Sequence, residues 1–379
     1  MATGFPTKAN WVSGDILTAA QMDDLAGTVN ALSNAAATSG SVLVSNVAGT
    51  SFAYQPLQAA GKNAVINGGM DIWQRGTSIA IGGNNAAYAS DRWYIATFTN
   101  AASTISRQPT SDTTNLPNIQ YCARVQRNSG QTGTGNIISQ SIETINSIPF
   151  AGKQVTLSFY ARAGANYSPT SNALTVVLYS GTGTDQNING GFTGQASPIA
   201  TTATLTTTWQ RFSFTATVAT TATELAPYFS AGSIGTAGAN DYFEITGVQL
   251  ELGSTATTFS RAGGSIGGEL ALCQRYYFRE SGTTGQVTTG FGVAYSTTNF
   301  YSAFKPKVTM RIVPTLDSYS SLQASNGIST LAVSSAVIWT NSTVDSPSIL
   351  CTTAGTFTAG TAWSLAFSGT GYVGFSAEL

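Results

Sequence analysis

Histidine is absent from all 379 residues of this chain. Histidine is the commonest general base and the commonest transition-metal ligand, so its absence excludes Ser-His-Asp and Cys-His nucleophile systems and any zinc site that needs an imidazole. Cysteine is also scarce, because Cys122, Cys273 and Cys351 are the three in the chain and no two are close in sequence. This spacing predicts three separate buried thiols rather than disulfides or a four-thiolate site. We therefore expect no metal and no cofactor.

Charged residues are few, at 9% of the chain, and the 16 basic and 17 acidic residues leave a net charge of −1. A soluble domain usually has about a quarter of its residues charged. Without a basic stripe to neutralise phosphates, nucleic-acid binding is not expected. One basic cluster, Lys305, Lys307 and Arg311, could meet an acidic glycan, but the spacing of two favours an exposed edge strand. A neutral surface of hydroxyls and amides favours a protein that works in an assembly.

Long apolar runs are missing as well. No stretch of 18 apolar residues is present, and MATGFPTKANW lacks the apolar segment of a signal peptide. The sequence therefore predicts no membrane insertion, and its sparse cysteines are consistent with folding in a reducing cytoplasm.

The residues that are abundant favour β-structure. Hydrophobic residues make up 42% of the chain, there are 40 glycines, and Thr, Ser and Asn are common. Between 63 and 262 the apolar residues recur with period two, as in Val155, Leu157 and Phe159, which predicts antiparallel strands with one buried face. A break in this alternation predicts a bulge at Gly247. The predicted fold is an all-β antiparallel β-sandwich, arranged as a jelly roll, whose core includes Trp73, Trp93, Phe159, Phe214 and Phe243.

The first 35 residues have a different pattern. Thr18 and Gln21 have the spacing of a helix capping box, and apolar residues then recur at steps of three and four. This predicts a short N-terminal α-helix at 1–35, either a self-associating or docking anchor or a helix folded back on the sandwich. The seam of that helix is formed by Met22, Leu25, Val29 and Leu32.

The remaining boundaries follow from composition. Residues 36–62 predict an extended neck, 63–262 the jelly-roll body, 263–278 a Gly-rich flexible hinge and connector, and 279–379 a C-terminal β-sandwich tip. Strands in the tip are expected around 291–295, 308–312, 336–339 and 363–367.

Paired carboxylates are the catalytic arrangement that needs neither histidine nor metal. Strand alternation puts Glu244 on the solvent side, opposite Phe243 and Ile245. We expect solvated or turn-capping roles for the acidic candidates and therefore no enzyme, with a small polysaccharide depolymerase as an alternative. The candidates are Asp23, Asp24, Asp71, Asp91, Asp241, Glu244 and Glu251.

Aromatic residues of the tip lie among Ser, Thr and Asn. Flat aromatic faces beside short hydrogen-bonding groups suit an uncharged sugar, which has an apolar face and a rim of hydroxyls. The predicted glycan-binding residues are Trp339, Trp363, Tyr295, Tyr301 and Tyr319, with core packing as the alternative for each. In the body, Asp91, Arg92 and Arg75 are expected to pair and to pin loop ends beside the buried indoles.

Three segments carry a resemblance to a known family. They are GKNAVINGGMDIWQRGTS at 61–78, YASDRWYI at 88–95 and EITGVQLELGSTATTFSRAGGSIGGELALCQRYY at 244–277. Their sequences resemble those of tailed-bacteriophage virion proteins, chiefly tail fibres and receptor-binding proteins, over positions 61 to 277.

The resemblance implies a structural virion protein made in the host cytoplasm and carried on the tail or capsid surface. It implies a homotrimeric fibre that docks to other virion proteins through residues 1–35 and contacts host surface polysaccharide through the tip. A capsid head fibre or decoration protein is the first alternative, the depolymerase the second, and a monomeric carbohydrate-binding module of a bacterial enzyme the third.

Overall fold

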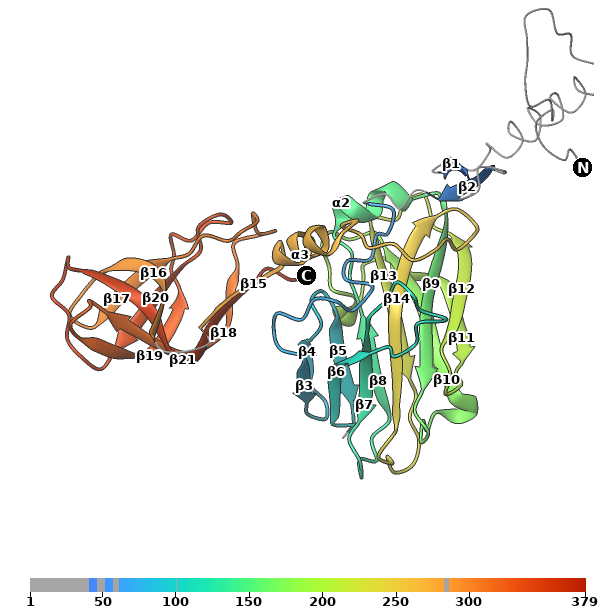
Figure 1. Cartoon of the computed structure of the whole chain (residues 1–379), viewed down its shortest axis with the longest axis horizontal. Helices are drawn as coiled ribbons and strands as arrows, with labels where there is room; N and C mark the ends of the chain where they lie inside the picture. The colour runs from blue at the N-terminus through green and yellow to red at the C-terminus, as the bar shows by residue number, and fades with distance from the viewer. Residues whose placement is uncertain (1–40, 46–51, 57–60, 100, 283–285) are drawn as a thin grey trace, which may run out of the picture. The chain divides into compact units, whose positions relative to one another are not determined.

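A computed structural model describes residues 41–45, 52–56, 61–99, 101–282 and 286–379 (Figure 1). The predicted N-terminal helix, with its seam Met22, Leu25, Val29 and Leu32, lies outside the described residues, as do Asp23 and Asp24. The chain divides into two compact units, 1–59 and 60–379.

The first unit contains one described hairpin. Strands β1 (Ser41–Ser45) and β2 (Phe52–Pro56) pair antiparallel, with Leu43 opposite Tyr54. The two apolar clusters of the predicted neck are therefore partners of each other in one chain.

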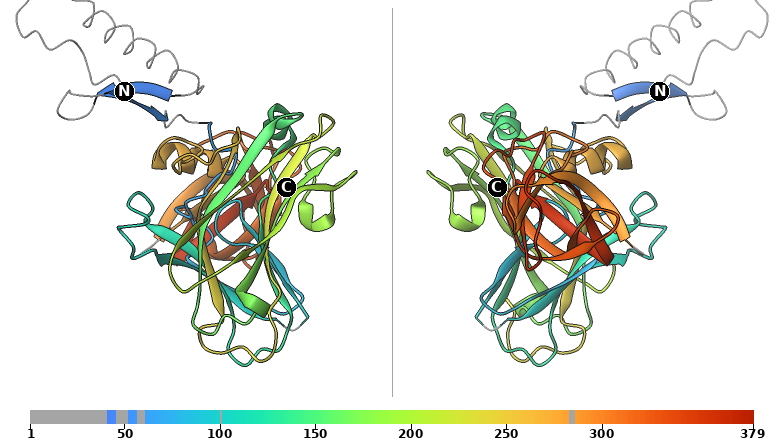
Figure 2. Two further views of the ribbon diagram at one scale, coloured as in Figure 1. Left: turned by 90° about the vertical axis from the view of Figure 1, so that its right-hand side faces the viewer. Right: turned by 90° about the vertical axis from the view of Figure 1, so that its left-hand side faces the viewer.

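The body of the second unit consists of two six-stranded antiparallel sheets, ordered β11-β10-β13-β8-β5-β4 and β12-β9-β14-β7-β6-β3. The strand axes of the two sheets are roughly aligned with each other (Figures 1 and 2). The prediction of an all-β jelly roll is confirmed. The strands are β3 (Ser78–Ile81), β4 (Ala86–Tyr88), β5 (Tyr94–Phe98), β6 (Ser103–Pro109), β7 (Tyr121–Arg127), β8 (Gly135–Ser139), β9 (Gln154–Ala163), β10 (Ala173–Gly181), β11 (Ala196–Thr204), β12 (Gln210–Thr217), β13 (Glu224–Ala231) and β14 (Tyr242–Leu252).

Short helical segments lie between these strands and between β14 and the C-terminal strands. In the described ranges the α-helices are α2 (Thr144–Ser147) and α3 (Ile266–Gln274), and the 3-10 turns are Ile148–Phe150, Thr170–Asn172 and Ile188–Gly190. Within the described ranges, no helix has the length and apolar character needed to cross a membrane.

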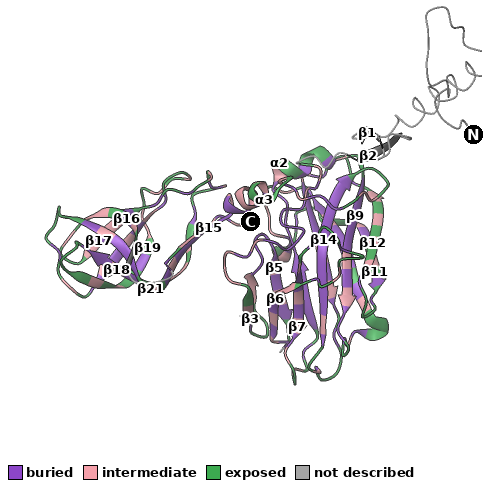
Figure 3. Ribbon diagram, viewed as in Figure 1, coloured by how far each residue is buried: buried purple, intermediate pink, exposed green. Residues whose placement is uncertain are grey.

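The body core lies between the two sheets. The Phe159 ring on β9 packs edge-on against Phe229 of the opposite sheet, with ring centroids 4.8 Å apart, and stacks on Phe212 at 5.4 Å. Figure 3 shows the central strand β14 buried along most of its length. Of the residues expected in this core, Trp73, Trp93, Phe159 and Phe243 are buried, and the half-buried Phe214 packs against them.

The bulge predicted at Gly247 is confirmed. The register between β14 and β9 shifts between Thr246 and Gln249, and Gly247 has φ +59°. A Cβ there would lie 2.8 Å from Ile119 and 2.9 Å from Tyr160, so glycine fits both the backbone angle and the space.

The C-terminal strands form one seven-stranded sheet, ordered β15-β21-β16-β17-β20-β19-β18, which closes because β21 also pairs with β18. We call it the tip sheet. It surrounds a second core that includes Phe300, Ile349, Leu365, Phe367 and Phe375. The strands are β15 (Tyr277–Ser281), β16 (Gln286–Ala294), β17 (Asn299–Ala303), β18 (Thr315–Ser325), β19 (Thr330–Ile338), β20 (Ser348–Thr353) and β21 (Ala362–Ser376).

Two expectations for the C-terminal region are wrong. The segment 308–312 is not a strand but part of the loop between β17 and β18. Lys305 and Lys307 are exposed on that loop rather than on a strand edge, and Arg311 turns away to pair with Asp185 at 3.2 Å. Prolines at 306 and 314 restrict the loop to non-ladder conformations.

The glycines of the predicted hinge lie around the start of helix α3, where Gly263 and Gly264 precede the helix and Gly267 and Gly268 are in its first turn. The Ser265 side chain caps the helix by accepting a hydrogen bond from the Gly268 amide at 3.1 Å. The Gly263 amide donates to Glu269 at 2.7 Å. A Cβ on Gly263 would lie 2.2 Å from the Gly268 carbonyl carbon, so these glycines allow close packing rather than freedom.

Glu244 corrects another expectation, since its exposed fraction is 0%. It is the cross-strand neighbour of Arg124 on β7 and Arg162 on β9, and the carboxylate pairs with both guanidinium groups at 2.6 and 2.5 Å. The alternation was right that Glu244 faces away from the core. The arginines cover that face, stacking on Tyr242 and Trp209 at 4.0 and 4.8 Å.

Replacing Glu244 by alanine should lower the free energy of unfolding by roughly 2 to 3 kcal/mol, because two partly covered guanidinium groups lose their counter-charge. Urea denaturation measures the change. Glu280→Ala is the matched control, since Glu280 makes no ion pair within the described residues, and it should change stability by less than about 0.5 kcal/mol. Equal losses in the two variants would contradict this account of Glu244.

Candidate functional site

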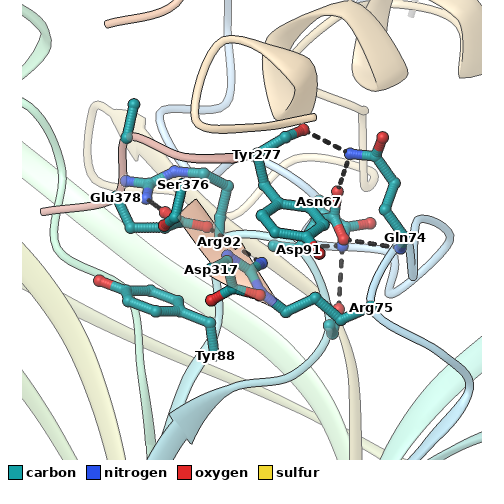
Figure 4. A network of polar contacts seen from close by, with 12 residues as sticks. Asn67, Gln74, Arg75, Tyr88, Asp91, Arg92, Tyr277, Asp317, Ser376 and Glu378 are labelled. Carbon is teal, nitrogen blue, oxygen red and sulfur yellow. Dashed lines mark hydrogen bonds and ion pairs between the residues drawn. The ribbon is translucent and has the colours of Figure 1, made fainter. Parts of the chain in front are cut away.

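The three segments that carry the family resemblance meet in one polar network, where the body contacts β15 and the end of β21 (Figure 4). We call it the junction network. Asn67 is its first member and is fully buried with φ +57°. Its side-chain oxygen accepts from the amides of Asp71 and Ile72, and its side-chain nitrogen donates to Ser90 and to the Asp91 carbonyl. One amide side chain therefore joins the loops at 67–72 and 90–91.

Asp91 continues the network toward the tip sheet. Its carboxylate accepts from the Gln74 backbone amide at 2.9 Å and from the Gln74 side chain, which also donates to the Tyr277 carbonyl at 2.8 Å (Figure 4). Burial raises the pKa of Asp91 to about 6, although Arg75 and the Gln74 hydrogen bonds oppose the shift.

Arg92 supplies the central charge of the junction network. Its guanidinium pairs with Glu378 beyond β21, donates to the Ser141 carbonyl at 2.7 Å and lies 3.6 Å from the centre of the Tyr276 ring. Arg75 also reaches Glu378, at 3.4 Å, and stacks on Tyr277 at 3.5 Å. The expected loop-pinning residues do pin loops, but Arg92 binds Glu378 rather than Asp91.

The junction network joins the body to β15 and the end of β21, and Asn67, Asp91 and Arg92 are buried in it. Nearby, Glu143 accepts from Arg275 at 2.8 Å and from the Tyr276 hydroxyl at 2.9 Å. The sequence segments that resemble virion proteins thus form a buried structural joint rather than a binding surface.

A better candidate for binding lies on the outer face of strands β5, β8, β13 and β10, which we call the body cleft. Its volume is about 230 Å³. Strand register puts its tyrosines on one face, because Tyr94 and Tyr228 are both cross-strand neighbours of Ser139. Its lining includes Tyr94, Phe98, Tyr179, Asn189, Gln195 and Tyr228.

The polar groups of the body cleft are held in place. Tyr179 and Tyr228 pack edge-on with ring centroids 5.3 Å apart, and burial, with a smaller contribution from Tyr179, raises the pKa of Tyr228 to about 12. Its hydroxyl is therefore a neutral donor. The Asn189 side chain donates to Ser139 at 2.9 Å, and Gln195 accepts from the Phe192 amide at 3.0 Å. No charged residue is part of the described lining.

Sequence reasoning missed the body cleft. The signal was present, because Tyr179 follows the inward Leu178 and Tyr228 precedes the inward Phe229, so both occupy outward strand positions. Which outward tyrosines become neighbours depends on strand order, and the sequence does not show that β10, β13, β8 and β5 are adjacent.

Three of the five aromatics predicted for the tip come together. Trp339 packs edge-on against Tyr295, with ring centroids 5.4 Å apart, and parallel to Tyr301 at 6.4 Å. Trp363 does not join them, because it is buried against Phe357 at 4.8 Å.

Tyr319, the fifth, lies apart in a groove of about 600 Å³ between β18 and β19. Its hydroxyl accepts from the Ala336 amide at 3.1 Å. The two strands pair only at 323–325 and 330–332, so the groove marks where they separate. Asp317 is the one charged residue among the described groove residues.

Three of the acidic candidates in the body form ion pairs. Asp71 pairs with Arg261 at 2.8 Å, Asp241 with Arg127 at 2.7 Å and Glu251 with Lys62 at 3.5 Å, and all three carboxylates are buried. Of the solvated or turn-capping roles expected for these residues, the solvated role is wrong because all three carboxylates are paired in the interior. Glu251 also accepts from the Thr257 amide at 2.9 Å, at the bend after β14. In the described part of the chain, no cluster of three or more acidic or thiol groups could hold a metal ion.

The fold defines a class: a jelly-roll β-sandwich joined to a closed antiparallel sheet. No protein-family model and no curated protein matches the chain. The solved structures to which it is similar include the following three, each at 14% identity. The CBM22-1 xylan-binding domain of Paenibacillus barcinonensis Xyn10C has TM-score 0.29 and covers 52% of this chain and 98% of that one. TmCBM61 in complex with β-1,4-galactotriose has TM-score 0.28, and the match covers 42% of this chain and 88% of that one. The enzymatically active domain of bacteriophage CBA120 tailspike protein 4 has TM-score 0.33, and the match covers 50% of this chain and 21% of that one.

The raised pKa of Asp91 predicts a pH dependence of stability. Between the unfolded pKa of about 3.9 and the folded pKa of about 6, the folded protein binds a proton that the unfolded chain releases, so the unfolding free energy falls as pH rises through this window. Asp91→Asn should remove this decline, which is at most about 3 kcal/mol for a shift of roughly two units. Urea unfolding at pH 4, 5, 6 and 7 measures it.

Burial also raises the pKa values of Glu224 and Glu269, and these two residues contribute to the pH dependence of stability in both the wild type and Asp91→Asn. The comparison therefore isolates Asp91. Parallel curves for the wild type and Asp91→Asn would contradict the prediction.

Proposed function

We propose that this chain is a non-enzymatic, glycan-binding structural protein of a tailed-phage virion, a homotrimeric fibre or receptor-binding protein that contacts host surface polysaccharide. The body cleft is the observation that carries the glycan part of the proposal. It combines half-buried tyrosine rings with fixed side-chain amides and has no charged residue in its described lining.

This chemistry suits a neutral sugar. A pyranose ring has an apolar face that packs on an aromatic ring, and hydroxyls that pair with amides and with neutral phenols such as Tyr228. The cleft is smaller than the roughly 300 to 1,000 Å³ of a small-molecule site, so it contacts a short stretch of a longer polysaccharide. Weak single sites suffice when several are linked, since linked sites raise avidity by roughly 10² to 10⁴.

The absence of turnover is supported by where the carboxylates lie. Glycoside hydrolysis needs two carboxyl groups on either side of the bond that breaks, separated by about 5 to 9.5 Å. No carboxylate is part of the described cleft lining, and Asp71, Asp241, Glu244 and Glu251 are committed to ion pairs elsewhere.

The virion part of the proposal rests on the resemblance of 61–78, 88–95 and 244–277 to virion proteins. In this proposal residues 1–35 dock to other virion proteins, and the neutral surface suits a part held on a particle. A capsid head fibre or decoration protein would use the same architecture. Labelling the N-terminus in intact particles and locating the label by electron microscopy separates tail from capsid.

Replacing Tyr228 by alanine should weaken single-site binding of host polysaccharide fragments about tenfold, because the cleft loses its central ring and a hydroxyl; tenfold corresponds to about 1.4 kcal/mol. Isothermal titration calorimetry measures the change. Tyr121→Ala is the matched control, since Tyr121 is a half-buried tyrosine on the other sheet, under Arg107 at 4.4 Å. Unchanged affinity in Tyr228→Ala would reject the body cleft as the site.

Incubating the wild-type protein with the same polysaccharide should release no new reducing ends. Sustained release, measured over hours with a colorimetric assay, would replace the proposal by the depolymerase alternative.

A further inference from the structure

Four neighbouring strands of the tip sheet carry an apolar outer face. Strand register aligns Val293, Tyr301, Leu350 and Val337 in one row across β16, β17, β20 and β19, and side chains in such a row point to the same side. We call this surface the tip face. It consists of Phe291, Val293, Tyr301, Val337, Trp339 and Leu350.

The tip face is open in the single chain. Phe291 is 78% exposed and Val337 is 56% exposed, and Tyr295 beside them is 60% exposed. The polar residues registered on this face, Asn299 and Thr352 among them, are uncharged. A contiguous exposed apolar surface of this kind usually marks an interaction site.

Strand β12 of the body has a polar outward face for comparison. The outward positions of β12 in the body are Arg211, Ser213, Thr215 and Thr217, all exposed and all polar. The tip face departs from that pattern on four adjacent strands at once. Solvation therefore does not explain the side chains chosen for it.

We propose that the tip face is covered by further copies of this chain, as the contact that joins the tips of the homotrimer. The inference rests on the proposed function for the homotrimer and adds the surface that forms it.

Chemistry favours a second copy over a sugar here. Tyr301 and Trp339 lie parallel to each other and Tyr295 packs edge-on against Trp339, so the rings contact one another rather than framing a sugar-sized gap. Aliphatic side chains fill the rest of the row, and a sugar hydroxyl would find few partners on them. An identical copy brings an equally uncharged apolar surface, so the contact leaves no buried charge unpaired.

Cysteine labelling tests the proposal in the full chain. The three native cysteines are buried, so a maleimide reagent reports on an introduced thiol. Phe291→Cys is the probe and Ile328→Cys the matched control, because Ile328 is 94% exposed on the turn between β18 and β19, off the tip face. In the assembled protein we expect Phe291→Cys to react at least about tenfold more slowly than Ile328→Cys.

Adding Val337→Glu to the probe should restore fast labelling, because a carboxylate on the tip face separates the copies. Equal labelling rates for the Phe291→Cys and Ile328→Cys single variants, or a single-chain mass for the wild type in light scattering, would overturn the inference. Far-UV circular dichroism confirms that each variant is folded.

Polysaccharide binding separates this inference from the proposed function. Val337→Glu should keep the single-site affinity of the body cleft, and loss of that affinity would make the tip face itself the glycan surface and overturn the inference. If wild-type protein binds no polysaccharide while the thiol of the Phe291→Cys variant is protected, the proposed glycan role fails and the tip contact stands.

Discussion

A buried guanidinium organises the second unit of this protein. Arg92 lies under the Tyr276 ring, bonds to the Ser141 carbonyl and pairs with Glu378, which follows the last strand of the tip sheet. A buried charge is tolerated only when it is paired and hydrogen-bonded, so Arg92 requires that the end of β21 return to the body. The jelly roll and the tip sheet are thereby joined by charge as well as by chain connectivity.

Buried ion pairs occur elsewhere in the second unit as well. With 9% charged residues, the chain places many of its ions in buried pairs, such as Glu244 between two arginines and Asp241 with Arg127. The surface is left to hydroxyls and amides. A neutral surface gives little electrostatic steering, so the glycan recognition proposed for the body cleft would depend on shape and on short hydrogen bonds.

The jelly roll and the tip sheet divide two tasks in this account. The body cleft has fixed amides and neutral phenols, which suit a hydroxylated ligand, whereas the tip face has aliphatic side chains and mutually packed rings, which suit a copy of itself. The proposed joining of copies through the tip face would bring several clefts into one assembly, and linked weak sites bind a repeating polymer far better than separate ones.

Period two was enough to predict the strands of the body and the inward position of Phe159, because side-chain direction alternates along any strand. The bulge at Gly247 was also predictable, since one extra residue interrupts that alternation. From segments 61–78 and 88–95 the sequence predicted that Asp91, Arg92 and Arg75 pin loop ends, but it did not show the partner Glu378, which is 286 positions from Arg92.

By itself the sequence determined the all-β class, the exclusion of histidine chemistry and the inward or outward position of most strand residues, all of which are local or compositional properties. Tertiary structure alone decided that Glu244 is buried, that Ser265 caps helix α3 within the Gly-rich segment, and that Tyr94, Tyr179 and Tyr228 share a cleft. The reason is that strand order and the packing of one element on another bring together residues far apart in the chain, and periodicity carries no information about them.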